Sequence, residues 1–320
     1  MDVSAFRCPR CHGHLSAHTE RLECDTASCG LLFPVVRGVP VLIDEGKSMF
    51  RLSDYAGDPL SKPEQSAVQR FALRWLPSLD LNVAAKHNVH LMKALLFSGG
   101  VRPKILSIGS KHPSGAMSSL CDHPDVECVS CDLVYADGVD VIADPVSLPF
   151  SDGVFDGLLV DAVLEHCIDP QGVVREIHRV LRSGGYVYSD TPFMIPVHAG
   201  AYDFCRFSAL AHRLLFNGFR QVEHGVSSGP AAALGYSIQS VLLAFTSSRR
   251  FRFAVKGLCR LLFFWIKYLD LLLARRPGAL DAALGTYFIG ERLPEPISDQ
   301  DLLACYAGAV PDLYVRSIRD

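Results

Sequence analysis

The sequence predicts an α/β fold whose core is a mostly parallel sheet with helices on both faces. From residue 103 onward, short apolar segments alternate with helical segments, as in strand–helix–strand units. A glycine turn follows the first apolar segment, and later segments end in an aspartate. The 320 residues are 49% hydrophobic and 20% charged, which allows a buried core and excludes a disordered chain. This length suggests two domains, or one large domain with an appendage.

The first module, predicted over residues 1–46, carries two pairs of cysteines. Cys8 and Cys11 form a C-x2-C knuckle, and Cys24 and Cys29 form a C-x4-C pair. Four thiolates in two close pairs suit a tetrahedral zinc ion, which would stabilise a segment too poor in large apolar residues for a core of its own. The alternative is a set of four reduced cysteines in a module that has lost its metal. Residues 33–43 read as two short strands around a Gly/Pro turn.

The segment from CPRCHGHL to FPVVRGVPVLI resembles the small zinc-ribbon domain that activates tRNA and protein methyltransferases. The same domain is found fused in front of bacterial methyltransferases. The resemblance implies a structural or docking module, because four protein thiolates leave no open position on the metal.

A linker with helices is predicted over residues 47–100. Residues 46–62 are rich in Gly, Ser, Asp and Pro and read as a connector. One helix is predicted to run from Pro63 to Trp75, and a second over residues 82–97, before a pair of glycines.

The core predicted over residues 101–228 contains five strands, at 104–108, 126–132, 139–144, 155–161 and 186–190. Helices are predicted at 116–121 and 170–182, the second ended by Ser183-Gly184-Gly185. Ligands of such sheets bind at the carboxyl ends of the strands. At that edge the turn at Gly109 would let backbone amides approach a ligand, and Asp132 could accept ribose hydroxyls. No phosphate-binding signature follows the turn, which favours a nucleoside without phosphates.

The core resembles class I S-adenosylmethionine-dependent methyltransferases of the ubiquinone/menaquinone type and of glycan gene clusters. The carrying segments are ILSIGS, ADPVSLPFSDGVFDGLLVDAVLEHCIDP and VVREIHRVLRSGGYV. The resemblance implies a Rossmann-like fold with a site for the cofactor. It implies that Gly109 and Ser110 contact the methionine end, that Asp132 binds the ribose, and that Asp144 and Pro145 flank the adenine. Asp161, Leu164 and His166 would lie near the sulfonium.

The first motif departs from this family. Ser107 stands where the family usually has an acid, and Lys111 where it usually has a glycine. A non-catalytic docking protein that has lost its cofactor is therefore the alternative.

The segment TPFMIPVH…YDFCRFS, residues 191–208, resembles a part of methyltransferases encoded with polysaccharide and glycoconjugate enzymes. His198 could take a proton from an acceptor hydroxyl, with Asp203 orienting it and His166 as a second base. Arg206 and Tyr202 would bind the acceptor. Alternatively, Asp203 and Arg206 form a structural ion pair. The preferred acceptor is an oxygen or nitrogen of a saccharide or lipid-linked glycan.

A methyltransferase acting on tRNA or protein is the further alternative that the ribbon suggests. Lysine and arginine total 31 against 34 acids, so no basic excess indicates a nucleic-acid partner.

The segment 229–293 is predicted to be apolar and helical, ending in a late strand at 287–290. Residues 249–276 combine a narrow basic stripe with a broad apolar surface, which suits a helix in an anionic membrane interface or a helix buried against the core or a second copy. The tail, 294–320, reads as a small helix with loose ends.

The predicted location is the cytoplasm, with peripheral contact at the inner face of the membrane. The start of the chain lacks the apolar core of a signal peptide, and we find no uncharged apolar stretch long enough for a spanning helix. The cysteines outside the ribbon are expected to be reduced and to pack as small hydrophobic residues.

Overall fold

We describe the protein from a computed structural model, which covers residues 3–56, 60–61, 66, 75–109 and 117–311. Apart from Ser66 and Trp75, the helix predicted from Pro63 falls outside these residues, as do Ser110 and Lys111.

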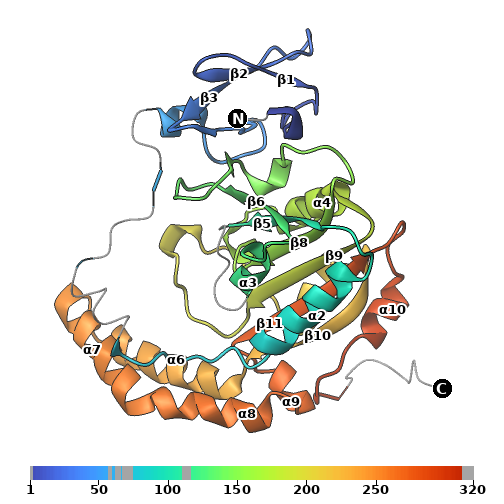
Figure 1. Ribbon diagram of the computed structural model, residues 1–320. Helices are drawn as coiled ribbons and strands as arrows, with labels where there is room; N and C mark the ends of the chain where they lie inside the picture. Colours follow the sequence, from blue (N-terminus) through green and yellow to red (C-terminus); the bar gives the residue numbers. More distant parts are fainter. Residues whose placement is uncertain (1–2, 57–59, 62–65, 67–74, 110–116, 312–320) are drawn as a thin grey trace.

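A seven-stranded sheet forms the centre of the molecule (Figure 1). Its strands are β5 (Lys104–Ile108), β6 (Glu127–Asp132), β7 (Val141–Ile142), β8 (Phe155–Asp161), β9 (Leu181–Pro192), β10 (Phe219–Ser228) and β11 (Gly285–Arg292). The order is β10-β11-β9-β8-β5-β6-β7, and the run from β9 to β7 is parallel, whereas β11 is antiparallel to β9 and β10. The mostly parallel α/β sheet is therefore confirmed.

The strand bounds agree with the sequence where apolar runs are flanked by turns. β5 and β8 have the predicted bounds, but β9 begins at Leu181 rather than at residue 186, because α4 (Pro170–Val180) ends before the glycines. β10 was not predicted as a strand, since its residues are mostly half-buried and lack a clear alternation.

Helices cover both faces of the sheet, as predicted. Alternate side chains of each strand enter two separate cores, so that Leu158 packs on the side of α4 and Leu159 on the side of α2. The first face is covered by α4 and α5 (Ala209–Leu215), and the second by α2 (Ala85–Phe97) and α3 (Ser118–Cys121). The site therefore rests on strands that are buried on both sides.

One pair of cysteines corrects an expectation. Cys121 at the end of α3 and Cys128 in β6 are joined by a disulfide, whereas the sequence suggested reduced thiols. The two residues are seven apart in sequence with a Cα–Cα distance of 5.1 Å, which lies within the usual range for a bridge.

The N-terminal module is a small sheet that packs on the edge of the large one. It consists of η1 (Val3–Ala5), β1 (Leu15–Ala17), β2 (Arg21–Cys24), β3 (Leu32–Val36) and β4 (Val39–Pro40), followed by η2 (Leu52–Tyr55). Phe6 packs on Phe150 with ring centroids 5.9 Å apart, and Val41 forms a parallel bridge with Ile142 of β7. The module and the sheet therefore share one hydrophobic core.

The C-terminal part adds a layer of helices beyond the sheet (Figure 1). Its elements are α6 (Pro230–Ala244), α7 (Arg249–Phe263), η7 (Phe264–Leu269), α8 (Asp270–Leu273) and α9 (Pro277–Leu280), and α10 (Asp299–Ala304) follows β11. None of the described helices is both long and apolar enough to span a membrane. The apolar segment predicted over 249–276 is thus helical, but divided into three elements.

Three charged side chains of this helical layer are bonded to neighbouring parts of the protein. Lys267 is buried and donates to Ser78 at 2.9 and 3.0 Å, and the buried carboxylate of Asp270 accepts from the amides of Ala231 and Ala232 at the start of α6. Half-buried Arg252 donates to carbonyls at the end of α6.

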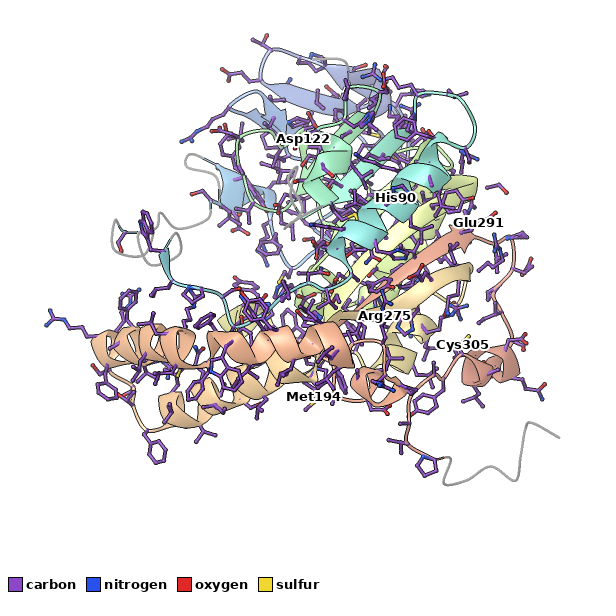
Figure 2. All side chains as sticks on the ribbon, turned by 60° about the horizontal axis from the view of Figure 1, so that its bottom comes forward. His90, Asp122, Met194, Arg275, Glu291 and Cys305 are labelled. Carbon is purple, nitrogen blue, oxygen red and sulfur yellow. A yellow bond between two sulfur atoms is a disulfide. The ribbon has the colours of Figure 1, made fainter. Side chains whose placement is uncertain are left out.

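Many large apolar side chains of the same helices are exposed, and Figure 2 shows side chains projecting outward from these helices. They include Phe245, Phe251, Leu258, Leu261, Trp265, Leu271 and Leu272, with exposed fractions between 54% and 84%. Exposed arginines flank them at residues 249–250 and 275–276. We call this outer surface of α6, α7, η7 and α8 the apolar platform.

Candidate active site

A pocket of about 510 Å³ opens at the carboxyl ends of β5, β6 and β8. From β5 the chain continues to β6 on one side of the sheet, and after β7 it returns to β8 on the other side of β5. The pocket therefore lies at the switch point of the sheet. The lining consists of Phe50, Leu60, Ser61, Ile108, Gly109, Cys131, Asp132, Leu133, Val134, Ala143, Pro145, Ala162, Val163, His166, Cys167, Ala199 and Tyr202. The lining brings together the predicted residues Gly109, Asp132, Pro145, His166 and Tyr202.

Gly109 turns the chain from β5 into the pocket. Its φ of +92° is a conformation that favours glycine, and a Cβ there would lie 2.5 Å from Cγ2 of Val163. The amide of Gly109 donates to the carbonyl of Cys131 at 2.8 Å. The glycine is therefore required by the local geometry, as the motif suggested.

The two acids of the second and third strands have different surroundings. Asp132 ends β6 and lines the pocket, where its carboxylate accepts from the amide of Val134 at 3.1 Å. The carboxylate of Asp144 does not line the pocket: it accepts from Ser48 at 2.6 Å and from the amide of Val146 at 3.1 Å. Burial raises the pKa of Asp144.

Two carboxyl groups lie side by side near the ends of β8 and β9. Asp161 is paired in register with Asp190 of β9, and Ala162 follows with a φ of +53°, an uncommon conformation for alanine. Burial, and then the charge of Asp161, raise the pKa of Asp190 well above its usual range. Leu164 is fully buried in the core rather than in the pocket wall.

One wall of the pocket comes from the segment after β9, which contains η6 (Gly200–Tyr202). The ring of Tyr202 stacks on Phe50 of the N-terminal part, with centroids 6.1 Å apart and planes at 16°. The carbonyl of Tyr202 accepts a hydrogen bond of 2.6 Å from Nδ1 of His166. The N-terminal module thus reaches the pocket through the linker.

Asp203 and Arg206 form the ion pair that was predicted as an alternative to substrate binding. The guanidinium contacts both carboxylate oxygens of Asp203 and also donates to three backbone carbonyls, those of Ile195, Pro196 and Cys205. Arg206 holds the pKa of the Asp203 carboxyl well below its usual range. The donors of Arg206 thus face the protein, which favours the structural role.

His198 belongs to the same segment after β9 and packs against His166. Its Nδ1 is 3.4 Å from Asp203, whose carboxylate also accepts from the His198 amide at 2.8 Å. The rings of His166 and His198 meet edge to face, with centroids 5.0 Å apart. His198 does not line the pocket, whereas His166 does.

The structure places Glu165 between the two histidines. Its carboxylate is fully buried, and Oε1 lies 3.7 Å from Nε2 of His166 and 3.8 Å from Nε2 of His198. Burial raises its pKa to about 7. The sequence pair Glu165-His166 at the end of a strand was the only signal for this arrangement.

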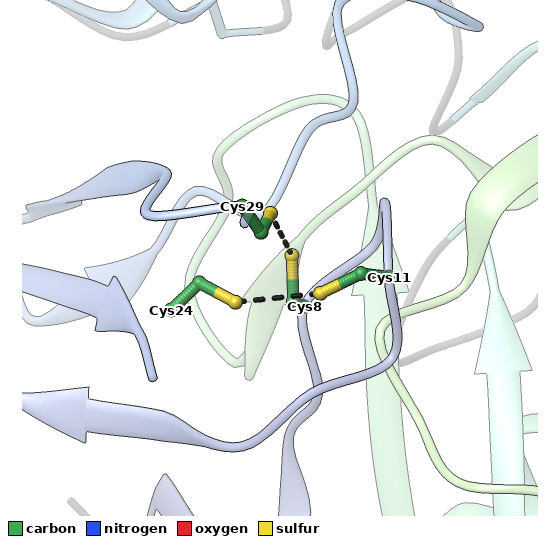
Figure 3. A group of neighbouring side chains, drawn as sticks. All are labelled: Cys8, Cys11, Cys24 and Cys29. Carbon is green, nitrogen blue, oxygen red and sulfur yellow. Dashed lines mark hydrogen bonds between the residues drawn. The ribbon is translucent and has the colours of Figure 1, made fainter. Parts of the chain in front are cut away.

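A second candidate site is the cysteine quartet of the N-terminal module (Figure 3). The sulfurs of Cys8 and Cys29 are 3.7 Å apart, those of Cys11 and Cys24 are 3.4 Å apart, and all four lie within 4.8 Å of one another. Sulfurs around a tetrahedral zinc ion with bonds of about 2.3 Å would be about 3.8 Å apart. The four residues therefore fit such an ion.

Comparison with known proteins places a methyltransferase domain on residues 123–189. The demethylmenaquinone methyltransferase of Mycolicibacterium paratuberculosis is 33% identical over 92 residues, which are 29% of this chain and 37% of that protein. The chain thus matches little more than a third of the relative's length.

The solved structures that match the chain include a putative sarcosine dimethylglycine methyltransferase from Galdieria sulphuraria (14% identity, TM-score 0.41, 73% of this chain and 92% of that one). A methyltransferase from Archaeoglobus fulgidus is 15% identical, with a TM-score of 0.38, over 65% of this chain and 92% of that one. The family match therefore identifies a methyltransferase domain within this chain, at residues 123–189.

Proposed function

We propose that the protein transfers a methyl group from S-adenosylmethionine to an oxygen or nitrogen atom of an acceptor. The observation that carries the proposal is the coincidence of pocket and family match: the lining residues from Cys131 to Cys167 fall within residues 123–189. A non-phosphorylated nucleoside suits this pocket, whose lining combines apolar side chains with one carboxylate, that of Asp132, at the end of a strand.

The residues of the pocket divide into two groups. Gly109 would allow the backbone to approach the methionine end, Asp132 would accept hydrogen bonds from the ribose hydroxyls, and Pro145 and Leu133 would flank the adenine. When bound, the cofactor supplies a methyl group activated by a positively charged sulfur. His166 and Tyr202 line the opposite wall, on the side where the acceptor would bind.

Much of the rate would come from positioning. The wall that carries Tyr202 is fixed by the Asp203–Arg206 pair and by the stacking of Tyr202 on Phe50. A rigid wall can hold an acceptor at attack distance from the methyl group, which lowers the entropic part of the barrier.

We propose a saccharide or lipid-linked glycan as acceptor and the inner membrane surface as the place of reaction. The apolar platform supports this, because its helices place Lys267 and Asp270 inside the protein and large apolar side chains outside. An exposed apolar surface of this kind, flanked by arginines, fits the interface of an anionic bilayer.

We also propose that the cysteine quartet binds a structural zinc ion. The sulfur distances support it, and four thiolates would leave no position for a substrate.

The cofactor proposal is tested by calorimetric titration with S-adenosylmethionine and S-adenosylhomocysteine. We expect micromolar binding that Asp132→Ala abolishes and that Asp137→Ala, an exposed carboxylate on the following loop, leaves unchanged. Binding that survives in Asp132→Ala would place the cofactor elsewhere.

The second candidate function is that of a non-catalytic docking protein. The favouring observation is Ser107, which is fully buried in β5 where the resemblance expects an acid. Failure of the wild-type protein to bind either ligand would favour it. A tRNA acceptor would instead appear as nucleic-acid binding that weakens steeply with salt.

A further inference from the structure

We propose that Glu165, His166 and His198 bind a divalent transition-metal ion beside the pocket. One carboxylate oxygen and one ring nitrogen from each histidine lie within 4.8 Å of one another. Ligand atoms of a tetrahedral ion with bonds of about 2.1 Å are about 3.4 Å apart. The two distances to Glu165 Oε1, 3.7 and 3.8 Å, exceed this only slightly, so small side-chain movements would complete the site.

The surroundings of the Glu165 carboxylate support a metal site independently of the distances. The carboxylate is fully buried, and neither of its oxygens has a hydrogen-bond partner in the described part of the chain. A buried carboxylate without a partner is costly, and such groups are normally paired or coordinate a metal. Both oxygens could be satisfied by one cation held between the histidines.

The histidines present the nitrogens that a metal requires. Nδ1 of His166 must donate to the carbonyl of Tyr202, since a carbonyl only accepts, and this leaves the lone pair of Nε2 facing Glu165. Nδ1 of His198 lies 3.4 Å from the carboxylate of Asp203, which leaves its Nε2 facing the same oxygen.

Arg206 is the competing neighbour of His198, with Nη2 at 3.5 Å from Nδ1. That nitrogen already donates to Asp203 at 2.8 Å and to the carbonyl of Pro196 at 3.4 Å. Asp203 is therefore the acceptor for the ring. Carboxylate–histidine–metal arrangements of this kind are common around metal ligands.

Two histidines and one carboxylate suit zinc, iron(II) or cobalt(II), and leave coordination positions for other ligands. His166 lines the pocket, so the open positions would be available to an oxygen of the acceptor. This use of the ion depends on the proposed function, whereas binding of the ion does not.

The site is tested on the full chain with its cysteine quartet already filled by one equivalent of zinc. Cobalt(II) is then titrated without cofactor, and visible absorption and calorimetry are recorded. We expect one further ion with weak absorption bands that lack sulfur-to-metal charge transfer. Glu165→Gln and His198→Gln should each weaken its binding at least about a hundredfold, and Asp203→Asn about ten- to a hundredfold.

His90→Ala, an exposed histidine on α2, is the matched control and should bind as the wild type does. Thermal melting of each variant reports whether it is folded. The proposal is overturned if the zinc-loaded wild type takes up no second ion, or if a folded Glu165→Gln protein binds it unchanged. A metal bound by a protein that does not bind S-adenosylmethionine would contradict the proposed function but not this site.

Discussion

Gly109 shows how a single residue shapes the pocket. Both its φ of +92° and the methyl group of Val163, 2.5 Å from an added Cβ, oppose any side chain. We expect Gly109→Ala to reduce the free energy of unfolding by about 1–3 kcal/mol and to weaken S-adenosylmethionine binding at least about tenfold. Urea unfolding and calorimetric titration measure the two effects.

Gly100→Ala is the control for this change, since Gly100 also has a positive φ but has no atom within 4 Å of its added Cβ. It should lose stability and keep cofactor binding. Gly109→Ala with unchanged affinity would mean that the turn does not contact the cofactor.

The buried carboxyl of Asp190 gives the protein a stability that depends on pH. Burial and the charge of Asp161 raise its pKa in the folded state, so the folded protein retains a proton that the unfolded chain has lost. Stability therefore decreases as pH rises from about 4 towards the raised pKa.

We expect Asp190→Asn to remove part of this dependence. In urea unfolding at pH 5 and pH 8, the difference in free energy should be smaller for the variant than for the wild type. Asp137→Asn, which changes an exposed carboxyl, should resemble the wild type. An equal difference in all three proteins would show that the folded protein does not retain a proton on Asp190 over this pH range.

At the scale of elements, the apolar platform differs from an ordinary surface helix. Fully burying a leucine contributes about 1.5–3 kcal/mol, so several exposed apolar side chains can hold a protein on a bilayer. We expect the protein to sediment with anionic vesicles of phosphatidylglycerol and phosphatidylcholine, and Trp265 fluorescence to shift to the blue.

The variant Leu271→Gln/Leu272→Gln should bind these vesicles at least about tenfold more weakly. Leu303→Gln, an exposed leucine on α10, is the control. Self-association in gel filtration, with no sedimentation, would identify a second copy as the occupant of the platform.

The elements also show what the sequence could and could not predict. Strands such as β5 and β8 were predictable, because their apolar runs are bounded by local turn signals. The sequence also predicted a stripe of charged residues over 249–276, but not which of these side chains face the rest of the protein. Lys267 and Asp270 face inward because their partners, Ser78 and the start of α6, are distant in sequence. The position of Glu165 between two histidines likewise depends on the fold of the segment after β9.

At the scale of the whole molecule, the N-terminal module is coupled to the pocket. The module shares a core with the sheet edge, where the amide of Arg7 donates to Pro149 and Ser147 donates to Pro9. The linker after it places Ser48 on Asp144, and Phe50 on Tyr202 in the pocket wall. A change in the ribbon should therefore alter cofactor binding, although no cysteine of the quartet lines the pocket.

Substitution of one cysteine of the quartet tests this coupling. We expect Cys11→Ser to lower bound zinc below one equivalent per chain, as measured by atomic emission, and to lower the Tm of a single unfolding transition, because the ribbon has little core of its own. Since the ribbon holds the linker against the pocket, S-adenosylmethionine affinity should decrease several-fold. Cys305→Ser, outside the quartet, should change neither property. Two separate transitions with unchanged affinity would mean that the ribbon folds independently of the pocket and that Phe50 needs no support from it.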